Sequence, residues 1–367
     1  MKHHSLYLDW YIHVPRVKYD LRSSGIAYFK YDLNLGEVDL SVNYTPRTAQ
    51  LLAERYGVKP ENVLVSSEGA SGQNSRIIRL IAERNGKKNE AIVEYPTYEP
   101  LLRQVQEHFP RVKRLERREE ESYGLNADAL RKSVSEKTGV LVVTNPHAPS
   151  GAIANVNELR EVMAVAHEYG FYVMCDEIYA EFERQAIPTV FSVDGEMGIV
   201  TTSFTKAYGL GGLRLGVALA QQSLVEELFN DVVDHIGGPS NLVQLAAVEL
   251  LTRGKAKLER HKQKWTVLKR QTEEWMNARG IEFSPNKAGI TYWVKLSIED
   301  THKWVNEHAI PKRSVAVVPG AFFLFKDGNE IVKSSNVRLG LGNINPEQPN
   351  LGDAFEAFEK AVGTYQK

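Results

Sequence analysis

The sequence has very little cysteine and no long apolar run. Cys175 is the single cysteine among 367 residues, so an internal disulfide is impossible and we expect a reducing, cytoplasmic location. No run of about 18 apolar residues occurs, so we expect no membrane-spanning helix. The first residues lack the apolar stretch of a signal peptide. The formal net charge is −1, which argues against nucleic acid or an anionic membrane as a partner.

The composition and the hydrophobic pattern indicate an α/β protein. Hydrophobic residues make up 43% and charged residues 25%, and the length allows one large and one smaller domain. Short β-branched runs alternate with longer amphipathic stretches, which predicts a mainly parallel sheet covered by helices. A helix beginning at Asn155 or Asn157 and ending at Gly170 is expected between the first two strands. The runs read as strands are 139–144, 171–175, 199–202 and 213–220.

The second half predicts a smaller C-terminal α/β domain. The pattern is helical over 241–279, with a break near Arg253 and Gly254, and such a long helix suits a span between two domains. Strands at 290–294 and 336–341 and helices at 299–308 and 351–365 follow. We therefore divide the chain into an N-terminal segment that packs with the small domain, a large domain and a small domain. Their limits are 1–40, 41–270 and 271–367.

The run SFTKAYGLGGLRLG at 203–216 carries the strongest chemical signal. Lys206 lies among small and hydroxyl residues, and Arg214 follows eight positions later. This pattern suits an amine that forms a Schiff base beside a phosphate, since glycines let the backbone approach a ligand closely. A single lysine is most often a solvated loop residue, but the surrounding pattern favours the functional interpretation. Asp176 and Lys206 both follow predicted strands, at the edge where open α/β sheets bind ligands.

A second signal is the run SSEGASGQ at 66–73, which opens a helical stretch over 74–83. Small residues at a helix start leave unpaired N–H groups at the positive end of the helix dipole, and these bind phosphate. Glycine and serine open many helices, so this run alone is a weak signal. It indicates a phosphate site only in combination with the lysine run.

Together, the lysine run, the stretch Asp176-Glu177-Ile178-Tyr179 and Arg214 resemble pyridoxal-phosphate (PLP) enzymes of the aspartate aminotransferase family, class I and II, fold type I. The resemblance extends from about residue 33 to the end of the chain. It implies a large domain with a mainly parallel, seven-stranded-type sheet between helices, and a smaller C-terminal α/β domain. It also implies PLP as cofactor, no metal, and a homodimer with shared active sites.

The resemblance further implies roles for single residues around the cofactor. Lys206 would form the Schiff base and shuttle a proton, and Asp176 would pair with the protonated pyridine nitrogen. Tyr179 would donate to the phenolic oxygen, O3′, and Tyr98 would stack on the pyridine face. The residues expected at the phosphate are Gly69, Ala70, Ser71, Ser203 and Arg214, with Tyr44 reaching from the neighbouring subunit.

Two residues are expected at the substrate. Arg338, in the run NVRLGLG at 336–342, would grip the α-carboxylate through two parallel hydrogen bonds. Gly36 resembles the glycine turn whose backbone meets the same carboxylate. A dicarboxylic substrate needs a second cation, for which Arg16, Arg22 and His235 are candidates, whereas an aromatic substrate needs an apolar pocket.

One position departs from the family pattern. The run NPHAPSG at 145–151 resembles the family turn N-P-x-N-P-[ST]-G, but Ala148 stands where the second asparagine bonds O3′. We expect a weaker hold on O3′ and a raised pKa of the lysine–cofactor imine, because a donor that favours the charged oxygen is missing. Asn145 or His147 could substitute through a shifted turn, and the sequence does not decide between them.

The leading functional hypothesis is an aminotransferase that acts on an amino acid and a 2-oxo acid of aspartate or aromatic type. A PLP-dependent lyase or decarboxylase is the alternative, since the fold does not fix the reaction. A regulator of the same fold is disfavoured because no basic helix-turn-helix precedes residue 33. A nicotinamide dehydrogenase is disfavoured because Arg214 occupies the third glycine position of G-x-G-x-x-G.

Overall fold

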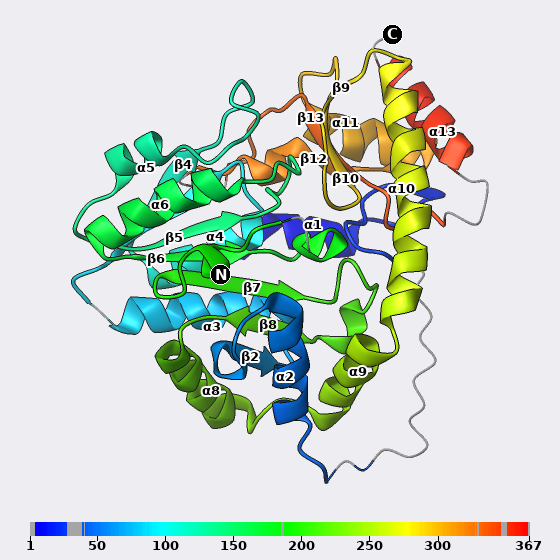
Figure 1. The fold of residues 1–367 in the computed structure, drawn as a ribbon. Helices are drawn as coiled ribbons and strands as arrows, with labels where there is room; N and C mark the ends of the chain where they lie inside the picture. Colours follow the sequence, from blue (N-terminus) through cyan, green and yellow to red (C-terminus); the bar gives the residue numbers. More distant parts are fainter. Residues whose placement is uncertain are drawn as a thin grey trace.

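A seven-stranded sheet forms the centre of the protein in a computed structural model, which describes residues 4–27, 39, 41–84, 86–184, 187–326, 328, 330–345 and 351–365 (Figure 1). The strand order is β2-β8-β7-β6-β5-β3-β4, and β8 alone runs antiparallel to its neighbours. This confirms the expected mainly parallel sheet. The strands are β2 (Val63–Ser66), β3 (Glu90–Tyr95), β4 (Arg111–Glu116), β5 (Thr138–Thr144), β6 (Tyr172–Asp176), β7 (Gly198–Ser203) and β8 (Gly216–Leu219).

Helices cover both faces of this sheet and create two apolar cores. In the central strand β6, Val173 and Cys175 belong to one core and Met174 to the other, as the two-residue period of a strand requires. The first core includes α6 and the second includes α3, α4 and α8. The helices of this part are α2 (Thr45–Tyr56), α3 (Gly69–Arg84), α4 (Glu99–His108), α5 (Ala127–Ser133), α6 (Val156–Tyr169), α7 (Val190–Val193), α8 (Gln222–Ile236) and α9 (Asn241–Thr252), with short 3-10 turns at Pro60–Asn62, Ala180–Phe182 and Gly211–Leu213.

The predicted ends of α6 are confirmed. Asn155, one of the two candidates, is the N-cap, and its side chain forms a reciprocal capping box with Glu158. Gly170 ends the helix in the left-handed conformation, with φ of 65°. The predicted break near Gly254 is also confirmed, because α9 ends at Thr252 and α10 (Lys255–Asn277) begins after it.

The strand expected over 213–220 is shorter than predicted. A 3-10 turn ends at Leu213, Arg214 has a left-handed φ of 57°, and β8 begins only at Gly216. The carbonyl of Arg214 accepts a hydrogen bond from the Gly69 N–H at 2.6 Å. This bond turns the chain toward the start of α3 before strand pairing can begin.

A smaller four-stranded antiparallel sheet lies beside α10, in the order β12-β13-β10-β9 (Figure 1). Its strands are β9 (Glu282–Ser284), β10 (Thr291–Lys295), β12 (Val318–Pro319) and β13 (Asn336–Gly340). The helix expected over 299–308 is longer than predicted, because it continues through a π-turn into α12. The remaining helical elements are α11 (Thr301–Trp304), the π-turn Val305–Ala309, α12 (Ile310–Arg313), the 3-10 turn Gly320–Phe323 and α13 (Leu351–Gly363).

The N-terminal residues pack between the two sheets. Helix α1 (Leu6–His13) lies between the central and the small sheet in Figure 1. Its Trp10 indole donates to Asn306 at 2.8 Å and contacts the ring of Phe322. The following strand β1 (Tyr19–Asp20) pairs in parallel with β11 (Val315–Ala316). The start of the chain therefore meets segments that lie about three hundred positions later.

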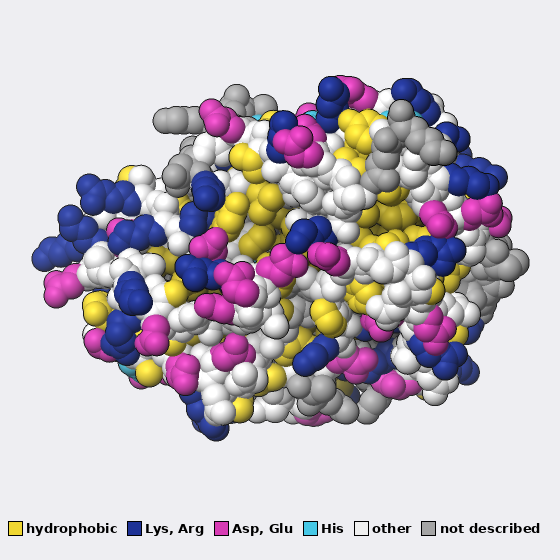
Figure 2. Space-filling view, turned by 90° about the horizontal axis from the view of Figure 1, so that it is seen from above, with side chains coloured by type: hydrophobic (Ala, Val, Ile, Leu, Met, Phe, Trp, Pro, Cys, Tyr) yellow, Lys and Arg dark blue, Asp and Glu magenta, His cyan; other side chains and the backbone are white. Residues whose placement is uncertain are grey.

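The surface fits the balanced charge of the sequence. In Figure 2, basic and acidic side chains are interspersed over most of the face seen from above, and hydrophobic side chains show mainly between them. In the part of the chain that the structure describes, no helix is both long and apolar enough to cross a membrane.

Candidate active site

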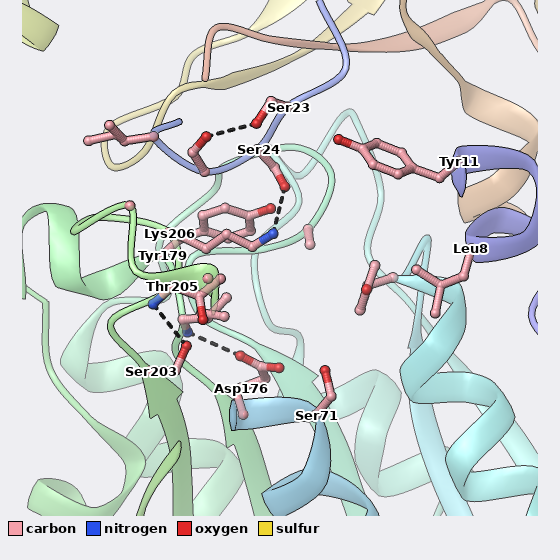
Figure 3. Close-up of a pocket in the computed structure, with 18 of the residues that line it drawn as sticks. Leu8, Tyr11, Ser23, Ser24, Ser71, Asp176, Tyr179, Ser203, Thr205 and Lys206 are labelled. Carbon is pink, nitrogen blue, oxygen red and sulfur yellow. Dashed lines mark hydrogen bonds between the residues drawn. The ribbon is translucent and has the colours of Figure 1, made fainter. Parts of the chain in front are cut away.

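A cavity of about 470 Å³ opens at the carboxyl edge of the central sheet (Figure 3). Thr144, Asp176 and Ser203 are the last residues of β5, β6 and β7, and all three line this cavity. Parallel strands end at the same edge, so their terminal side chains converge there. The wall opposite is formed by α1, by residues 23–27 and by Arg338 of β13.

Lys206 enters the cavity from the turn after β7. Its Nζ donates a hydrogen bond to the Ser24 hydroxyl at 2.9 Å, and Figure 3 shows this bond above Asp176. Desolvation of the amine lowers the pKa of Lys206 below its ordinary value of 10.5, and the cation of Arg338 acts in the same direction. A lower pKa increases the fraction of neutral, nucleophilic amine.

Asp176 is a buried carboxylate with fixed orientation. One oxygen accepts from the Asn74 side chain at 2.8 Å, and the other accepts from the Ile178 N–H at 3.1 Å. Thr201 in turn donates to Asn74. Burial raises the pKa of the Asp176 carboxyl, and these hydrogen bonds oppose the shift. A cation placed next to this carboxylate would be strongly favoured.

The first turn of α3 and Arg214 form a cradle for an anion. Ala70 and Ser71 line the cavity at this helix start. The first N–H groups of a helix have no acceptor within the helix, so they suit an anionic ligand. Gly69 has a left-handed φ of 71°, and a Cβ there would lie 2.6 Å from a guanidinium nitrogen of Arg214. Only glycine therefore lets Arg214 lie against the helix start. Arg214 donates to the Glu68 carbonyl at 3.1 Å.

Arg338 reaches the opposite end of the cavity from the middle of the small sheet. Its Nη2 donates to the Arg22 carbonyl at 2.7 Å and to the Tyr7 hydroxyl at 3.2 Å. The residue is 3% exposed, and its buried Nε has no hydrogen-bond partner among the described residues. A buried guanidinium N–H without a partner is costly, so this end is suited to a carboxylate ligand.

Aromatic side chains form the wall between these ends. The ring of Tyr7 on α1 meets the ring of Tyr98 edge-on, with centroids 5.7 Å apart. Leu8 and Tyr11 extend from the same helix toward the cavity (Figure 3). The helix is held by the Glu99 carboxylate, which accepts from the N–H groups of α1 at Leu6 and Tyr7, at 3.1 and 2.8 Å, and from the Ser5 hydroxyl.

The turn with the missing asparagine offers no substitute donor. Ala148 lines the cavity, and its N–H donates to Thr144. The two ring nitrogens of His147 bond the Ser150 hydroxyl at 2.7 Å and the Pro96 carbonyl at 2.9 Å. The Asn145 side-chain oxygen accepts from the Ala154 N–H at 3.0 Å, and its amide nitrogen donates to the Pro188 carbonyl at 3.5 Å. Neither Asn145 nor His147 lines the cavity. Both alternatives that the sequence left open are therefore engaged elsewhere.

Most of the predicted site residues meet in this one cavity. Tyr44 does not line it, and its hydroxyl donates to the Asp39 carbonyl at 3.3 Å. Gly36 lies outside the described residues, and Gly69 adjoins the cavity through Arg214. The predicted residues that line it are Ala70, Ser71, Tyr98, Asp176, Tyr179, Ser203, Lys206, Arg214 and Arg338.

The sequence interpretation missed the contribution of the first thirty residues. A weak signal was available in the glycines of the Arg338 run, because a Cβ at Gly340 or Gly342 would collide with the backbone of Ser23 or Gly25. Glycines in a strand indicate that another backbone segment approaches closely, but they do not indicate which segment it is. The missed residues that line the cavity are Tyr7, Leu8, Tyr11, Ser23, Ser24, Gly25, Ile26 and Ala27.

The three candidates for a second substrate cation do not line the cavity. Arg22 forks onto the Asp20 carboxylate at 2.8 and 2.9 Å, which neutralises its charge. Arg16 is exposed, and the ring of His235 on α8 bonds the backbone of its own helix. None of the three candidates therefore faces the cavity that the described residues form.

Comparison with known proteins places these features in a family. The profile of the family described as "Aminotransferase class I and II" matches residues 29–349. An aspartate aminotransferase of Pyrococcus abyssi is 28% identical over 264 residues, which cover 68% of this chain and 62% of that protein. An aromatic-amino-acid aminotransferase of Thermococcus litoralis is 27% identical over 220 residues, 56% of this chain and 54% of the relative. The matched regions thus span less than two thirds of both relatives.

The fold is likewise similar to solved structures. A PLP-dependent aminotransferase from Streptococcus suis superimposes with a TM-score of 0.85 over 100% of both chains, at 22% sequence identity. At this identity the likeness establishes the fold and not the reaction.

Proposed function

The chain belongs to the aminotransferase class I and II family, and we propose that it catalyses PLP-dependent transamination between an amino acid and a 2-oxo acid. The observation that carries this proposal is the convergence of three groups on one cavity: the amine of Lys206, the buried carboxylate of Asp176 and the guanidinium of Arg338. A nucleophilic amine, a partner for a cationic ring and a carboxylate clamp are the groups that such a reaction needs.

The residues around the cavity fit PLP. Its phosphate would lie at the first turn of α3, against Ser71, Ser203 and Arg214, where Gly69 leaves room for the guanidinium. Its pyridinium nitrogen would meet Asp176, which is buried and oriented by Asn74. These contacts and the burial of Asp176 support PLP as the cofactor independently of the family match.

The remaining ring contacts are proposed from the lining of the cavity. Tyr179 would donate to O3′, and Tyr98 would lie on the ring face. Because Ala148 brings no donor and Asn145 and His147 are engaged, Tyr179 is the protein donor that we assign to O3′.

When bound, the cofactor supplies an aldehyde for the amine and a ring that takes up the electron pair released at the substrate α-carbon. The neutral amine of Lys206 takes the α-proton and becomes an ammonium. It later donates this proton at a second carbon and not at the α-carbon, so the proton is conserved. Arg338 binds the α-carboxylate through the donors that its contacts with Tyr7 and Arg22 leave free. Helix α1 helps to exclude water from the far wall.

The lining favours an aromatic or large apolar substrate over an aspartate-type one. The basic side chains that line the cavity among the described residues are Lys206, Arg214 and Arg338, and each has a role above. The wall beside Arg338 presents Tyr7, Leu8 and Tyr11 from α1. Aromatic rings of a substrate can pack on such a wall without leaving a buried carboxylate unpaired.

A homodimer completes the proposal. Tyr44 lies away from the cavity of its own chain, so a contact of its hydroxyl with a cofactor phosphate requires the cavity of a second copy. Light scattering of the purified protein tests the assembly. A monomer that transaminates at full rate would overturn it.

A spectroscopic experiment tests the function. The purified protein is mixed with PLP, and the visible imine band is followed while single amino acids are added without an oxo acid. We expect the band to convert to the near-ultraviolet amine form and to return when a 2-oxo acid is added. A band that persists while ammonia or carbon dioxide is released would replace transamination by elimination or decarboxylation. Absence of any band would overturn the cofactor assignment.

A further inference from the structure

The Ser24 hydroxyl is the hydrogen-bond partner of the candidate catalytic amine. Ser24 is 7% exposed, and its Oγ lies 2.9 Å from Lys206 Nζ. Within the described residues, this is the single hydrogen bond of that amine. The carboxylate of Asp176 is oriented instead by Asn74 and Ile178. Figure 3 shows Ser24 on the opposite side of the amine from Asp176.

The backbone fixes the position of this hydroxyl from two sides. On one side, the Ile26 N–H donates to the carbonyl of Lys206 at 2.9 Å. On the other side, the Gly342 N–H donates to the carbonyl of Ser23 at 3.0 Å. Between them, a Cβ at Gly25 would lie 3.0 Å from Cδ of Lys206, so the segment lies directly against the lysine side chain.

A hydroxyl suits an amine that changes its charge. Its oxygen accepts a hydrogen bond from an ammonium, and its O–H donates to the lone pair of a neutral amine. A carboxylate at the same place would hold the ammonium too firmly to release its proton. An alanine would leave the amine free to rotate among its rotamers.

We propose that Ser24 is a positioning residue that holds the Lys206 amine in place whenever this amine is not covalently bound, including the time during which it carries the substrate proton. The inference rests on the proposed function. The proton passes from the substrate α-carbon to Nζ and later leaves Nζ, while Ser24 keeps its own proton. The serine therefore acts through the lysine and does not itself react.

The test compares Ser24→Ala with Ser24→Thr, which keeps the hydroxyl, in the holoenzyme. For Ser24→Ala we expect the rate constant of the first half-reaction at saturating amino acid to fall about 10- to 100-fold, the effect of losing one hydrogen bond to a charged group. The isotope effect of an α-deuterated amino acid should increase, because proton transfer becomes slower relative to the other steps. Ser24→Thr should restore both quantities.

A second measurement uses the cofactor-free protein and needs no turnover. The rate at which Lys206 captures PLP is followed by the visible band, and the site is confirmed by borohydride trapping and peptide mass spectrometry. We expect slower capture in Ser24→Ala, because the amine has lost its preferred orientation. Ser133→Ala is the control, since the Ser133 hydroxyl bonds the Ala129 carbonyl at 2.9 Å and Ser133 does not line the cavity. It should leave the isotope effect unchanged.

The outcomes separate this inference from the proposed function. A fall of less than about threefold in both rates, or a fall without a change in the isotope effect, would overturn the role of Ser24. If the parent protein captures PLP on Lys206 but transfers no amino group, the proposed function fails and the capture rate alone decides about Ser24. If the parent protein captures no PLP, both proposals fall.

Discussion

The two halves of the cavity are built in different ways. The half at the central sheet consists of strand ends and the turns that follow them, such as Asp176 at the end of β6 and Lys206 in the turn after β7. The other half combines α1 and residues 23–27 with Arg338, which lies far from both in the sequence and meets them only through long-range contacts. A site of the first kind leaves a compact motif in the sequence, whereas a site of the second kind leaves almost none.

The two halves also differ in the chemistry that we propose for them. The sheet half offers the helix start of α3, Arg214 and Asp176 to the cofactor. The other half offers Arg338 and the aromatic wall of α1 to the substrate. A variant in the sheet half should therefore change cofactor affinity, and a variant in the other half should change substrate affinity. The predictions below test this separation.

The largest effect is expected where the halves meet. Lys206→Ala removes the proposed nucleophile and base, so transamination should fall by about 10⁴-fold or more. Borohydride should no longer trap PLP at this position. Thermal unfolding should show a folded protein, because the variant loses an amine whose desolvation disfavours its charge. Substantial residual transamination by a folded Lys206→Ala protein would refute the central assignment.

The next largest effect is expected when each of the two arginines that line the cavity is replaced by glutamine. Arg338→Gln should raise KM for the amino acid about 10- to 100-fold, since a charge-assisted hydrogen bond is lost, while PLP affinity remains unchanged. Arg214→Gln should weaken PLP binding by a similar factor and leave KM nearly unchanged in the fully loaded enzyme. Equilibrium titration with PLP and steady-state kinetics measure the two quantities. Equal losses of both quantities in both variants would mean that the halves are not separate.

A smaller effect is expected from the anchor of α1. Glu99→Ala removes the acceptor of three hydrogen bonds from residues 5–7, so α1 should loosen and KM should rise by about 3- to 30-fold. Hydrogen exchange of residues 6–13 should become faster. Glu107→Ala, an exposed change on the same helix α4, is the control and should alter neither quantity. Unchanged exchange in Glu99→Ala would show that the carboxylate does not hold α1.

A pH profile tests the electrostatics of the lysine. Because desolvation lowers the pKa of Lys206, its neutral form should predominate at a lower pH than for a free lysine. The rate of PLP capture by the cofactor-free protein should therefore rise with pH and reach its plateau around a midpoint below 10.5. The same shift means that the folded protein binds fewer protons than the unfolded chain between the two pKa values, so this burial costs stability that is recovered as the pH rises. A midpoint at or above 10.5 would contradict the assignment.

The smallest effect concerns the departure from the family turn. Ala148→Asn places an amide donor next to the cavity, which should favour the charged form of O3′ and lower the pKa of the lysine–cofactor imine. Turnover should change by less than about threefold, because the donor does not transfer a proton. A titration of the visible band measures the shift. An unchanged pKa would mean that O3′ does not face Ala148.

The large sheet could be predicted because its signals are local, and nine of the predicted site residues line the cavity. The run around Lys206 requires glycines and hydroxyls within a few positions, and the strand before Asp176 has the apolar character of a buried strand. The Asn155 cap and the Gly170 end of α6 follow from the same kind of short-range chemistry. The division of the chain at residues 40 and 270 stays a prediction.

Apart from Arg338, the substrate half could not be predicted, because the contacts that form it are long-range. Tyr7 lines the site because it contacts Arg338 and Tyr98, and no local property of the first helix predicts either contact. Ser24 is an ordinary serine in the sequence and becomes notable only because Ile26 bonds the backbone of Lys206. The neutralisation of Arg22 by Asp20 likewise depends on a fork geometry that spacing alone does not specify.

The parallel pairing of β1 with β11 has a consequence for biosynthesis. The strands of the central sheet lie between residues 63 and 219, so this sheet can form while the rest of the chain is still being translated. Residues 19–26 must wait on the nascent chain until the segments around 315 and 340 have left the ribosome. The order of synthesis thus allows the proposed cofactor half of the cavity to form before the proposed substrate half.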